Sequence, residues 1–475
     1  MLGSVTFAPN EFNRIAEGLI PKSGCIAYDS EQKLIKVNCE SITLTDIYHN
    51  LNNPGILGKE NDTEGTSSRV LHKSIWVLDA GIVVEKAGGL VIDSNDTSWL
   101  KITSSPTLQL KNVSENNSDI KNKVNDSQNT SDITDINDKR IDSKNQSDTI
   151  TVSKHNGDNP NGIHVHGSLK IDSVKITSWD PEKSDVIRFG FGKRLGEEHT
   201  KSEYDTAEPR AFIRVSKDAT GTTNITNSEI AYLGYSCSRC SGLSYYGGEG
   251  SLIRNNDIHH LLKGFYSKNA GYLTIDSNQF HHNYLYGIDP HTGSHDLAIT
   301  NNIVYKNNAS GIICSKDCYN LLIEGNEVYE NSGAARGIAF SINTTKSVAK
   351  NNYVHDQPRC ISFNRGSDSN AVYNNTISNC KTAVSISSAV NNSIYDNEIK
   401  GAKNGILLKN PDNKIYNNRI FNSTNGIVFE VVPTNQSKGI GNIDTLNEYD
   451  EQNNYLADVA GDNNIVDTEF PTLLN

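Results

Sequence analysis

The chain has 475 residues, enough for one large solenoid or for two to three ordinary domains. Its 44 Lys and Arg against 56 Asp and Glu give a net charge of −12, which argues against general binding of nucleic acid or anionic membranes. Hydrophobic residues make up 35% of the chain, a low share for a globular core but sufficient for the thin core of a solenoid. No run of about 18 apolar residues occurs, so we expect no membrane span, and the opening Met1–Ser4 shows no signal peptide.

In chain order, residues 1–70 form a small N-terminal region or cap, with a hairpin-like stretch from Cys25 to Cys39. Residues 71–111 contain short apolar runs that predict the first strands of a solenoid. Residues 112–155 are rich in Asn, Ser, Asp, Lys and Thr and lack aromatic rings of Phe, Tyr or Trp, so we expect a disordered insert. The solenoid resumes over residues 156–430, and residues 431–475 leave the repeat as an acidic tail or cap.

The region after residue 240 is a ladder of near-repeats. A Gly-Ile-like step recurs every 21 to 26 residues from Gly242 to Gly426, and each step is followed by short apolar runs and an Asn-centred turn. The runs are too short for helices and predict strands, and a fixed period in this range is typical of solenoids. Asn tolerates left-handed turn dihedrals, and stacked Asn side chains can bond one another. We predict an all-β chain, a right-handed parallel β-helix with coils about 4.8 Å apart.

One repeat departs from the others by carrying titratable groups. Residues 286–291 read Tyr-Gly-Ile-Asp-Pro-His, where the other copies carry mostly apolar or small residues. The positions one and three residues after each Gly are mostly apolar and should point inward. Strand alternation then turns Asp289 and His291 outward to solvent on one sheet. This run is the candidate site of chemistry.

Basic residues recur at outward positions on both sides of this run. Stacked repeats would align them into two strips, although scattered Lys and Arg on a solvated face would give a similar pattern. Because the whole chain is acidic, a polyanionic substrate would depend on these local strips. The candidate substrate-binding residues are Lys263, Lys268, Arg336, Arg359 and Arg365.

The eight Cys residues fall into pairs that are close in sequence, which suits disulfides and an oxidising compartment, extracellular, cell-surface or periplasmic. Buried free thiols are the alternative. The pairs are Cys25/Cys39, Cys237/Cys240, Cys314/Cys318 and Cys360/Cys380. No second pair lies at metal spacing from Cys237-x-x-Cys240. The pairs His281-His282 and His291/His295 would lie at different positions around a coil, so we expect no metal and no cofactor.

The run at residues 286–291 resembles the signature of the mannuronan C5-epimerases, β-helical enzymes that act on alginate. The resemblance extends over roughly residues 75–430 without the insert, and several segments resemble the bacterial periplasmic epimerase of this class. These segments are Ser98–Ile102, Lys175–Asp180, Tyr232–Tyr235 and Lys263–Tyr266. The resemblance implies epimerisation at C5 of uronate residues in an anionic polysaccharide, from poly-β-D-mannuronate to α-L-guluronate.

Such a reaction removes a proton α to a carboxylate and returns one from the other face of the sugar. It needs a cation on the carboxylate, a base and an acid. The resemblance implies His291 as the base and Tyr286 as the acid, or as the partner of a water that reprotonates C5. It implies Asp289 as the group that orients His291 or sets its charge. It also implies that Lys316, one coil further on, neutralises the substrate carboxylate.

Two residues depart from the family pattern. Thr292 follows the His, where the family usually carries an acid, and Lys316 stands where the bacterial enzyme has Arg. A lysine is a point charge instead of a bidentate fork, so its grip on a carboxylate is weaker. Lys263 corresponds to a lysine of the secreted epimerases in this comparison.

Two other functions remain open from the sequence. A polysaccharide lyase shares the abstraction of the C5 proton and then expels the C4 substituent by β-elimination. A non-enzymatic surface solenoid that binds glycans is the other. It predicts no cluster of titratable groups, and the cluster at residues 286–291 argues against it.

Overall fold

The computed structural model describes residues 24–60, 74–104, 161–188, 209–235, 239–332, 336–410 and 412–430, together with the backbone of β40 (Glu448–Tyr449), β41 (Tyr455–Leu456) and β42 (Ile465–Leu474). The predicted insert at residues 112–155 lies outside the described residues. Among the described residues there is no helix that is long and apolar enough to cross a membrane.

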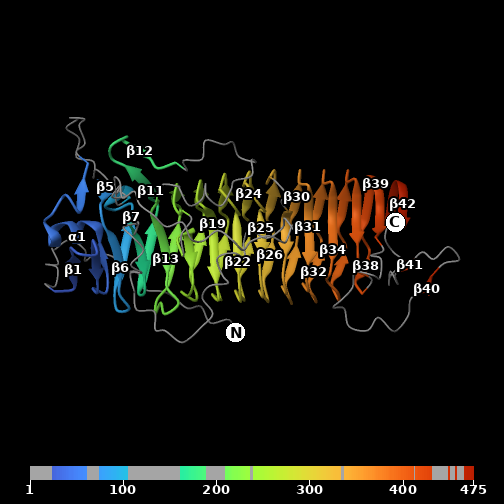
Figure 1. The fold of residues 1–475 in the computed structure, drawn as a ribbon, viewed down its shortest axis with the longest axis horizontal. Coiled ribbons are helices and arrows are strands. Elements are labelled where there is room, and N and C mark those ends of the chain that lie inside the picture. Colours follow the sequence, from blue (N-terminus) through green and yellow to red (C-terminus); the bar gives the residue numbers. More distant parts are fainter. Residues whose placement is uncertain are drawn as a thin grey trace, which may run out of the picture.

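The chain winds into a parallel β-helix, whose coils stack along one long axis (Figure 1). The coils contribute short strands to three faces, and these strands pair in parallel with their equivalents on the neighbouring coils. The exception is β4 (Leu57–Lys59) at the N-terminal end, which pairs antiparallel with β5 (Ser74–Leu78). The described residues thus confirm the parallel β-helix predicted from the repeat.

The first face carries the candidate site, and its strands are β2 (Leu34–Val37), β6 (Gly81–Val84), β9 (Gly162–Val165), β13 (Phe212–Val215), β16 (Gly242–Tyr245), β19 (Lys263–Lys268), β22 (Ile288–His291), β25 (Ile312–Cys314), β28 (Arg336–Phe340), β31 (Arg359–Asn364), β34 (Thr382–Ser387), β37 (Asn404–Leu408) and β39 (Arg419–Phe429). The second face contains β4 (Leu57–Lys59), β5 (Ser74–Leu78), β8 (Thr97–Thr103), β11 (Lys175–Asp180), β15 (Glu229–Ala231), β18 (Asp257–His259), β21 (Gln279–His281), β24 (Ile303–Tyr305), β27 (Glu327–Tyr329), β30 (Tyr353–His355), β33 (Thr376–Ser378) and β36 (Glu398–Lys400). The third face contains β3 (Ile42–Thr43), β7 (Gly89–Asp93), β10 (Ser168–Asp172), β14 (Thr223–Thr226), β17 (Leu252–Arg254), β20 (Thr274–Asp276), β23 (Ala298–Thr300), β26 (Leu322–Glu324), β29 (Val348–Lys350), β32 (Ala371–Tyr373), β35 (Ser393–Tyr395) and β38 (Lys414–Tyr416).

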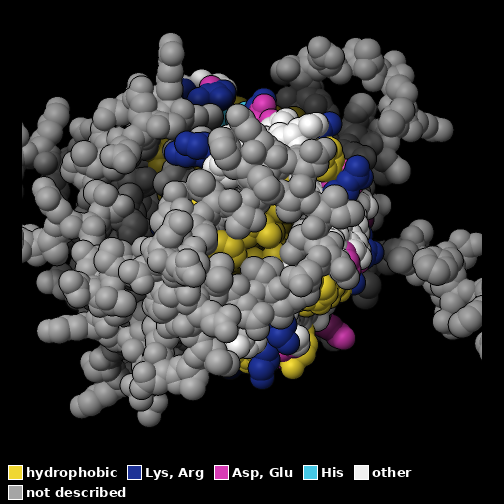
Figure 2. Space-filling view, turned by 90° about the vertical axis from the view of Figure 1, so that its right-hand side faces the viewer, with side chains coloured by type: hydrophobic (Ala, Val, Ile, Leu, Met, Phe, Trp, Pro, Cys, Tyr) yellow, Lys and Arg dark blue, Asp and Glu magenta, His cyan; other side chains and the backbone are white. Residues whose placement is uncertain are grey.

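Branched aliphatic side chains fill the interior because every second strand residue points inward. Ile288 lies opposite Ile312, and Ile312 opposite Ile338, and all three are fully buried. The inward-facing columns belong to one continuous core that runs the length of the coil. An end-on view shows hydrophobic side chains at the centre and Lys and Arg towards the rim (Figure 2).

Buried Asn side chains close the turns between faces. The side chain of Asn278 donates through Nδ2 to Oδ1 of Asn302 at 3.0 Å, and Asn302 donates to Asn326 in the same way. Each Oδ1 also accepts the backbone N–H of the preceding Asn, as in the 3.0 Å bond from Asn278 to Asn302. These bonds satisfy polar groups that would otherwise be buried at a cost of about 1–3 kcal/mol each. The predicted Asn stack is therefore confirmed, and it fixes the register between coils.

The N-terminal end of the coil is covered by a small cap. β1 (Ile26–Asp29) and β2 form an antiparallel hairpin closed by the Cys25–Cys39 disulfide, as the sequence suggested. The helix α1 (Leu44–Leu51) begins with a capping box between Thr43 and Asp46 and buries Leu44 and Ile47. These buried leucine and isoleucine side chains join the solenoid core and shield its end from water. The short strand β12 (Asp185–Val186) pairs with the end of β11.

Candidate active site

Parallel pairing brings the titratable run beside two other polar strands. β19 lies against β22 with Tyr266 opposite Asp289 and Lys268 opposite His291. Since Ile288 points into the core, the alternation of the strand turns Asp289 to the outer side. The candidate residues of β19 and β22 thus lie on one outer surface, about 5 Å apart in the direction of the hydrogen bonds.

Asp289 lies at the centre of a buried charge pair. The ammonium of Lys263 is 2.9 Å from Oδ2 of Asp289, and the hydroxyl of Ser315 donates to Oδ1 at 2.6 Å. Asp289 is fully buried, and the side chain of Lys263 is 13% exposed. Our expectation that Asp289 faces solvent was wrong, because Lys263 and Ser315 from the two neighbouring coils close over the carboxylate.

Two tyrosine rings surround the ammonium of Lys263. Its Nζ lies 4.3 Å from the ring centroid of Tyr266 and 5.7 Å from that of Tyr286. Cation–π contacts of this kind attract the ammonium to the ring faces. The ring of Tyr286 is therefore linked to Asp289 through Lys263, and the three residues form one electrostatic unit.

His291 is held at the edge of this unit. Its Nδ1 lies 2.6 Å from Oγ1 of Thr292, and its ring centroid is 5.7 Å from that of Tyr266. His291 is 6% exposed, so it too is more buried than expected. Thr292 has a φ of 20°, in a region that β-branched residues rarely occupy. The strained backbone of Thr292 and its short contact with Nδ1 together orient the imidazole, next to the ring of Tyr266.

The other candidate basic residues lie further along the first face. Lys316 lies in the turn after β25, half-buried, and its carbonyl accepts the N–H of Gly293. Arg336 and Arg359 lie opposite each other in β28 and β31. Arg365 follows β31 in a turn with a φ of 47°. Thus Lys263, Lys268 and Lys316 surround the titratable run, whereas the three arginines lie two or more coils away.

The sequence did not indicate the roles of Ser315, Tyr266 or Thr292. Ser315 lies within Cys-Ser-Lys, and only the coil register shows that its hydroxyl reaches Asp289. In the sequence, Thr292 differs from the family pattern only in standing where an acidic residue is usual, and nothing there indicates its contact with His291. A further polar pair was also missed, His164 and Arg214, with Nη2 of Arg214 at 2.7 Å from Nδ1 of His164. Burial, followed by the charge of Arg214, lowers the pKa of His164 well below its usual range.

The cysteine predictions have mixed outcomes. Disulfides join Cys25 to Cys39 and Cys360 to Cys380, as expected, and Cys240 is also disulfide-bonded. Cys237 lies outside the described residues.

The expected pair Cys314/Cys318 was wrong, because both are buried free thiols. Cys314 occupies a core column opposite Phe340, and Cys318 donates through Sγ to the carbonyl oxygens of Pro290 and Lys316. Burial raises the pKa of Cys318 to about 12, so this thiol is protonated at neutral pH.

The histidines that were weighed as metal ligands have other partners. Nε2 of His281 is 2.7 Å from Asp257, and the His281 ring stacks between those of His259 and Tyr305 on the second face. His295 pairs with Asp296 at 2.7 Å. In the described part of the chain, no group of three His, Cys, Asp or Glu side chains could hold a metal ion.

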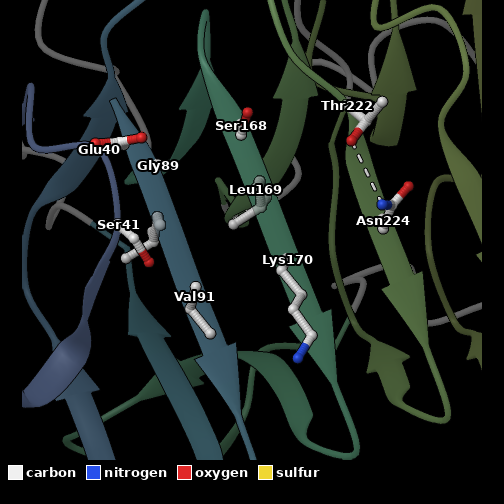
Figure 3. Close-up of a pocket in the computed structure, with 10 residues that line it drawn as sticks. Glu40, Ser41, Gly89, Val91, Ser168, Leu169, Lys170, Thr222 and Asn224 are labelled. Atoms are coloured by element: carbon white, nitrogen blue, oxygen red, sulfur yellow. Dashed lines mark hydrogen bonds between the residues drawn. The ribbon is translucent and has the colours of Figure 1, made fainter. Parts of the chain in front are cut away.

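A cavity of about 200 Å³ lies on the third face, away from this site. It is a depression over β7, β10 and β14, lined by Ser168, Lys170 and Asn224 among others (Figure 3). Its lining residues include no His or Cys and only two charged side chains, Glu40 and Lys170. The cavity therefore offers less chemistry than the outer surface of β19 and β22.

The model of the right-handed β-helix region family matches residues 213–376. Together with the parallel pairing of its three faces, this match defines the chain as a right-handed parallel β-helix.

Its similar curated relatives are mannuronan C5-epimerases. One from Pseudomonas putida is 25% identical over 246 residues, 49% of this chain and 44% of the relative. One from Pseudomonas fluorescens is 27% identical over 165 residues, 32% of this chain and 28% of the relative. The resemblance seen in the sequence is thereby confirmed. The chain spans less than half the length of these relatives.

A solved structure of the periplasmic alginate epimerase AlgG has the same fold. It superposes with a TM-score of 0.59 at 16% identity, covering 83% of this chain and 80% of that chain. At this identity the likeness concerns the β-helix itself.

Proposed function

We propose that this protein is a polysaccharide C5-epimerase, an isomerase that converts β-D-mannuronate units of a polyuronate into α-L-guluronate. The observation that carries the proposal is the cluster of Lys263, Asp289 and His291 on the outer surface of the β-helix. The run that supplies two of these residues is the one that resembles the epimerase signature, and the similar curated relatives carry the name mannuronan C5-epimerase.

The first step is removal of the proton at C5. His291 is the base, and its imidazole is oriented by the 2.6 Å contact with Thr292. The proton is acidic only when the adjacent carboxylate is neutralised, because the carbanion places charge on that group. Lys316 supplies this positive charge from the next coil. Both oxygens of Asp289 already have partners, Lys263 and Ser315. Its role is therefore to position these two side chains and to balance the charge of Lys263.

The second step returns a proton to the opposite face of the sugar. Tyr286 is the acid in this proposal, because its ring lies near the ammonium of Lys263, at 5.7 Å from Nζ to the ring centroid. A positive charge beside a phenol stabilises the phenolate that remains after proton donation. Lys263 thus connects the acid to Asp289 and keeps the site electrically balanced during the reaction.

The substrate is an anionic polymer lying along the first face. Lys268 lies opposite His291 in β19, on the preceding coil. Arg336 and Arg359 add positive charge two and three coils after His291. We also place the protein outside the cytoplasm, because the disulfides Cys25–Cys39 and Cys360–Cys380 suit an oxidising compartment.

The test is incubation with polymannuronate in heavy water, followed by proton NMR. An epimerase produces guluronate signals and incorporates deuterium at C5. A lyase instead produces an unsaturated uronate, which is detected by its ultraviolet absorbance. A glycan-binding solenoid produces neither, and that outcome would reject the enzymatic proposal.

Variants of the same assay test the individual roles. His291→Ala should lower turnover by at least 100-fold, whereas the matched control His355→Ala, on the second face, should retain it. Lys316→Ala should also impair turnover, and Lys316→Arg should retain or raise it, because guanidinium makes two parallel bonds to a carboxylate. If His291→Ala keeps more than a tenth of the rate, another residue is the base.

A further inference from the structure

A second group of catalytic residue types lies on the first face, three coils before the candidate site. β9 and β13 are neighbouring parallel strands with Val165 opposite Val215. The residues that follow them, His166 and Ser216, therefore lie side by side, and the Ser216 hydroxyl is 3.3 Å from Nε2 of His166. A serine and a histidine in hydrogen-bond contact are the two members of a nucleophile–base pair.

A carboxylate completes the chain of hydrogen bonds. Nδ1 of His166 is 2.7 Å from Oδ1 of Asp218, and Lys86 pairs with the other oxygen of Asp218 at 2.9 Å. Partial burial raises the pKa of Asp218, but the hydrogen bonds from Lys86 and His166 outweigh it and leave the pKa below its usual value. An ionised Asp218 requires a proton on Nδ1 of His166. Nε2 of the neutral ring is then the acceptor for the Ser216 hydroxyl, which is the tautomer that a serine nucleophile needs.

The turn after Ser216 supplies backbone donors. Ala219 closes this turn by donating its N–H to the carbonyl of Ser216 at 3.1 Å. The N–H groups of Lys217 and Asp218, inside the turn, have no acceptor among the described residues. Uncommitted N–H groups directly after a nucleophile are the kind of donor that stabilises an oxyanion. His166 and Ser216 are each 7% exposed, comparable to His291 at 6%.

We propose that Ser216, His166 and Asp218 form a second catalytic centre, a serine esterase that removes acyl groups from the hydroxyls of a polysaccharide. Ser–His–Asp arrangements act on acyl carbons, and the acyl carbons that a polysaccharide carries on its hydroxyls are esters. Glycosidic bonds, by contrast, are cleaved by paired carboxylates.

The position of the centre identifies its substrate as the same polymer. Three strand spacings separate Ser216 on the β13 coil from His291 on the β22 coil, about 14 Å. An extended chain on the first face would pass over both. The choice of polymer rests on the proposed epimerase function, whereas the esterase chemistry rests on the three side chains alone.

The reaction balances without a further co-reactant except water. Oγ of Ser216 bonds to the acyl carbon while Nε2 of His166 takes its proton. The ester bond to the sugar oxygen breaks, and the proton on His166 passes to that oxygen, which leaves a free hydroxyl and an acylated Ser216. Water then attacks the acyl group with His166 again as base, which releases the carboxylic acid and restores the serine.

The test uses the full-length protein and two small probes that require no polymer. A fluorophosphonate should label Ser216, as read by mass spectrometry of the digest, and p-nitrophenyl acetate should be hydrolysed. Ser216→Ala and His166→Gln should lower both signals by at least 100-fold. Ser244→Ala is the matched control, because Ser244 is a buried serine on the next strand whose hydroxyl has no hydrogen-bond partner among the described residues, and it should leave both signals unchanged.

Several outcomes would overturn the esterase. Absence of label on Ser216, or equal labelling in His166→Gln, means that the three residues only brace the turn. If Ser216→Ala fails to fold, Ser216→Cys replaces it: a thiol activated by His166 should react with iodoacetamide faster than the same thiol in Ser216→Cys/His166→Gln, and equal rates reject the proposal. C5 deuterium exchange reports on the epimerase separately, so either activity can fail while the other stands.

Discussion

Replacing Lys263, whose ion-pair partner is buried, should lower the free energy of unfolding more than the same replacement of a lysine whose ion-pair partner is exposed. In Lys263→Met the carboxylate of Asp289, which is fully buried, loses its cation and is left with the 2.6 Å bond from Ser315 as its side-chain hydrogen bond within the described part of the chain. Breaking a buried ion pair in this way costs about 3–5 kcal/mol of unfolding free energy, because one charge is left without compensation. Lys306→Met is the control. Lys306 pairs with Glu330 at 3.6 Å, and both side chains are about half exposed, so its loss should cost about 0–1 kcal/mol.

The double variant Lys263→Met/Asp289→Asn distinguishes pairing from simple loss of packing. With both charges removed, Asn can still accept the hydroxyl of Ser315, and we expect the double variant to be more stable than Lys263→Met by about 2 kcal/mol. The assay is urea unfolding followed by circular dichroism, with hydrogen exchange of the β22 amides as a local readout, since solenoid stability is largely local. Additive effects of the two substitutions would refute the claim that Lys263 and Asp289 form one coupled unit.

Three further predictions follow from single positions. Thr292→Val should lower kcat about tenfold with little change in KM, because His291 loses its 2.6 Å contact; an unchanged kcat would show that Thr292 does not orient the base. Gly287→Ala should lower the urea midpoint, since an added Cβ would lie 2.8 Å from the carbonyl oxygen of Gly311 and 2.5 Å from Val304; a midpoint equal to wild type would contradict the close approach of these coils. Burial and then the neighbouring imidazole of His259 lower the pKa of His260 from 6.5 to about 4, so the unfolded chain binds a proton that the fold does not between these pH values, and unfolding free energy should fall as pH drops from 6.5 to 4. His260→Asn should flatten this slope in melts taken across that range.

The sequence was sufficient for the fold because the signals that specify it are local and repeated. Inward columns such as Ile288, Ile312 and Ile338 follow from strand alternation, and they lie in register in the structure. The Asn turns could be predicted for the same reason, since successive coils carry an Asn at the equivalent position and the stacked amides hydrogen-bond to one another. The resemblance to the epimerases rested on the six consecutive residues 286–291 and on several further short segments, all of which are visible in the sequence alone.

Contacts between coils were decided only by the tertiary structure. Asp289 and Lys263 are 26 residues apart, and so are Asp289 and Ser315, and the sequence placed Asp289 in solvent. His166 and Ser216 are 50 residues apart across a stretch whose repeat is not visible in the sequence. The pairing of Cys314 with Cys318 failed because nearness in sequence does not make a disulfide: Cys314 fills an inward column opposite Phe340, and the Cys318 thiol donates to backbone carbonyls instead.

The physical reason lies in what each level of structure specifies. Period-two alternation and apolar character determine which way a side chain points, and a single chain segment contains that information. Which outward side chain meets which depends on the number of residues in every intervening turn and on irregularities such as the register shift between Gly242 and Ser244. The sequence by itself therefore determined the coil and its reactive repeat, whereas the buried charge pair and the serine–histidine–aspartate chain exist only because the coils stack in one particular register.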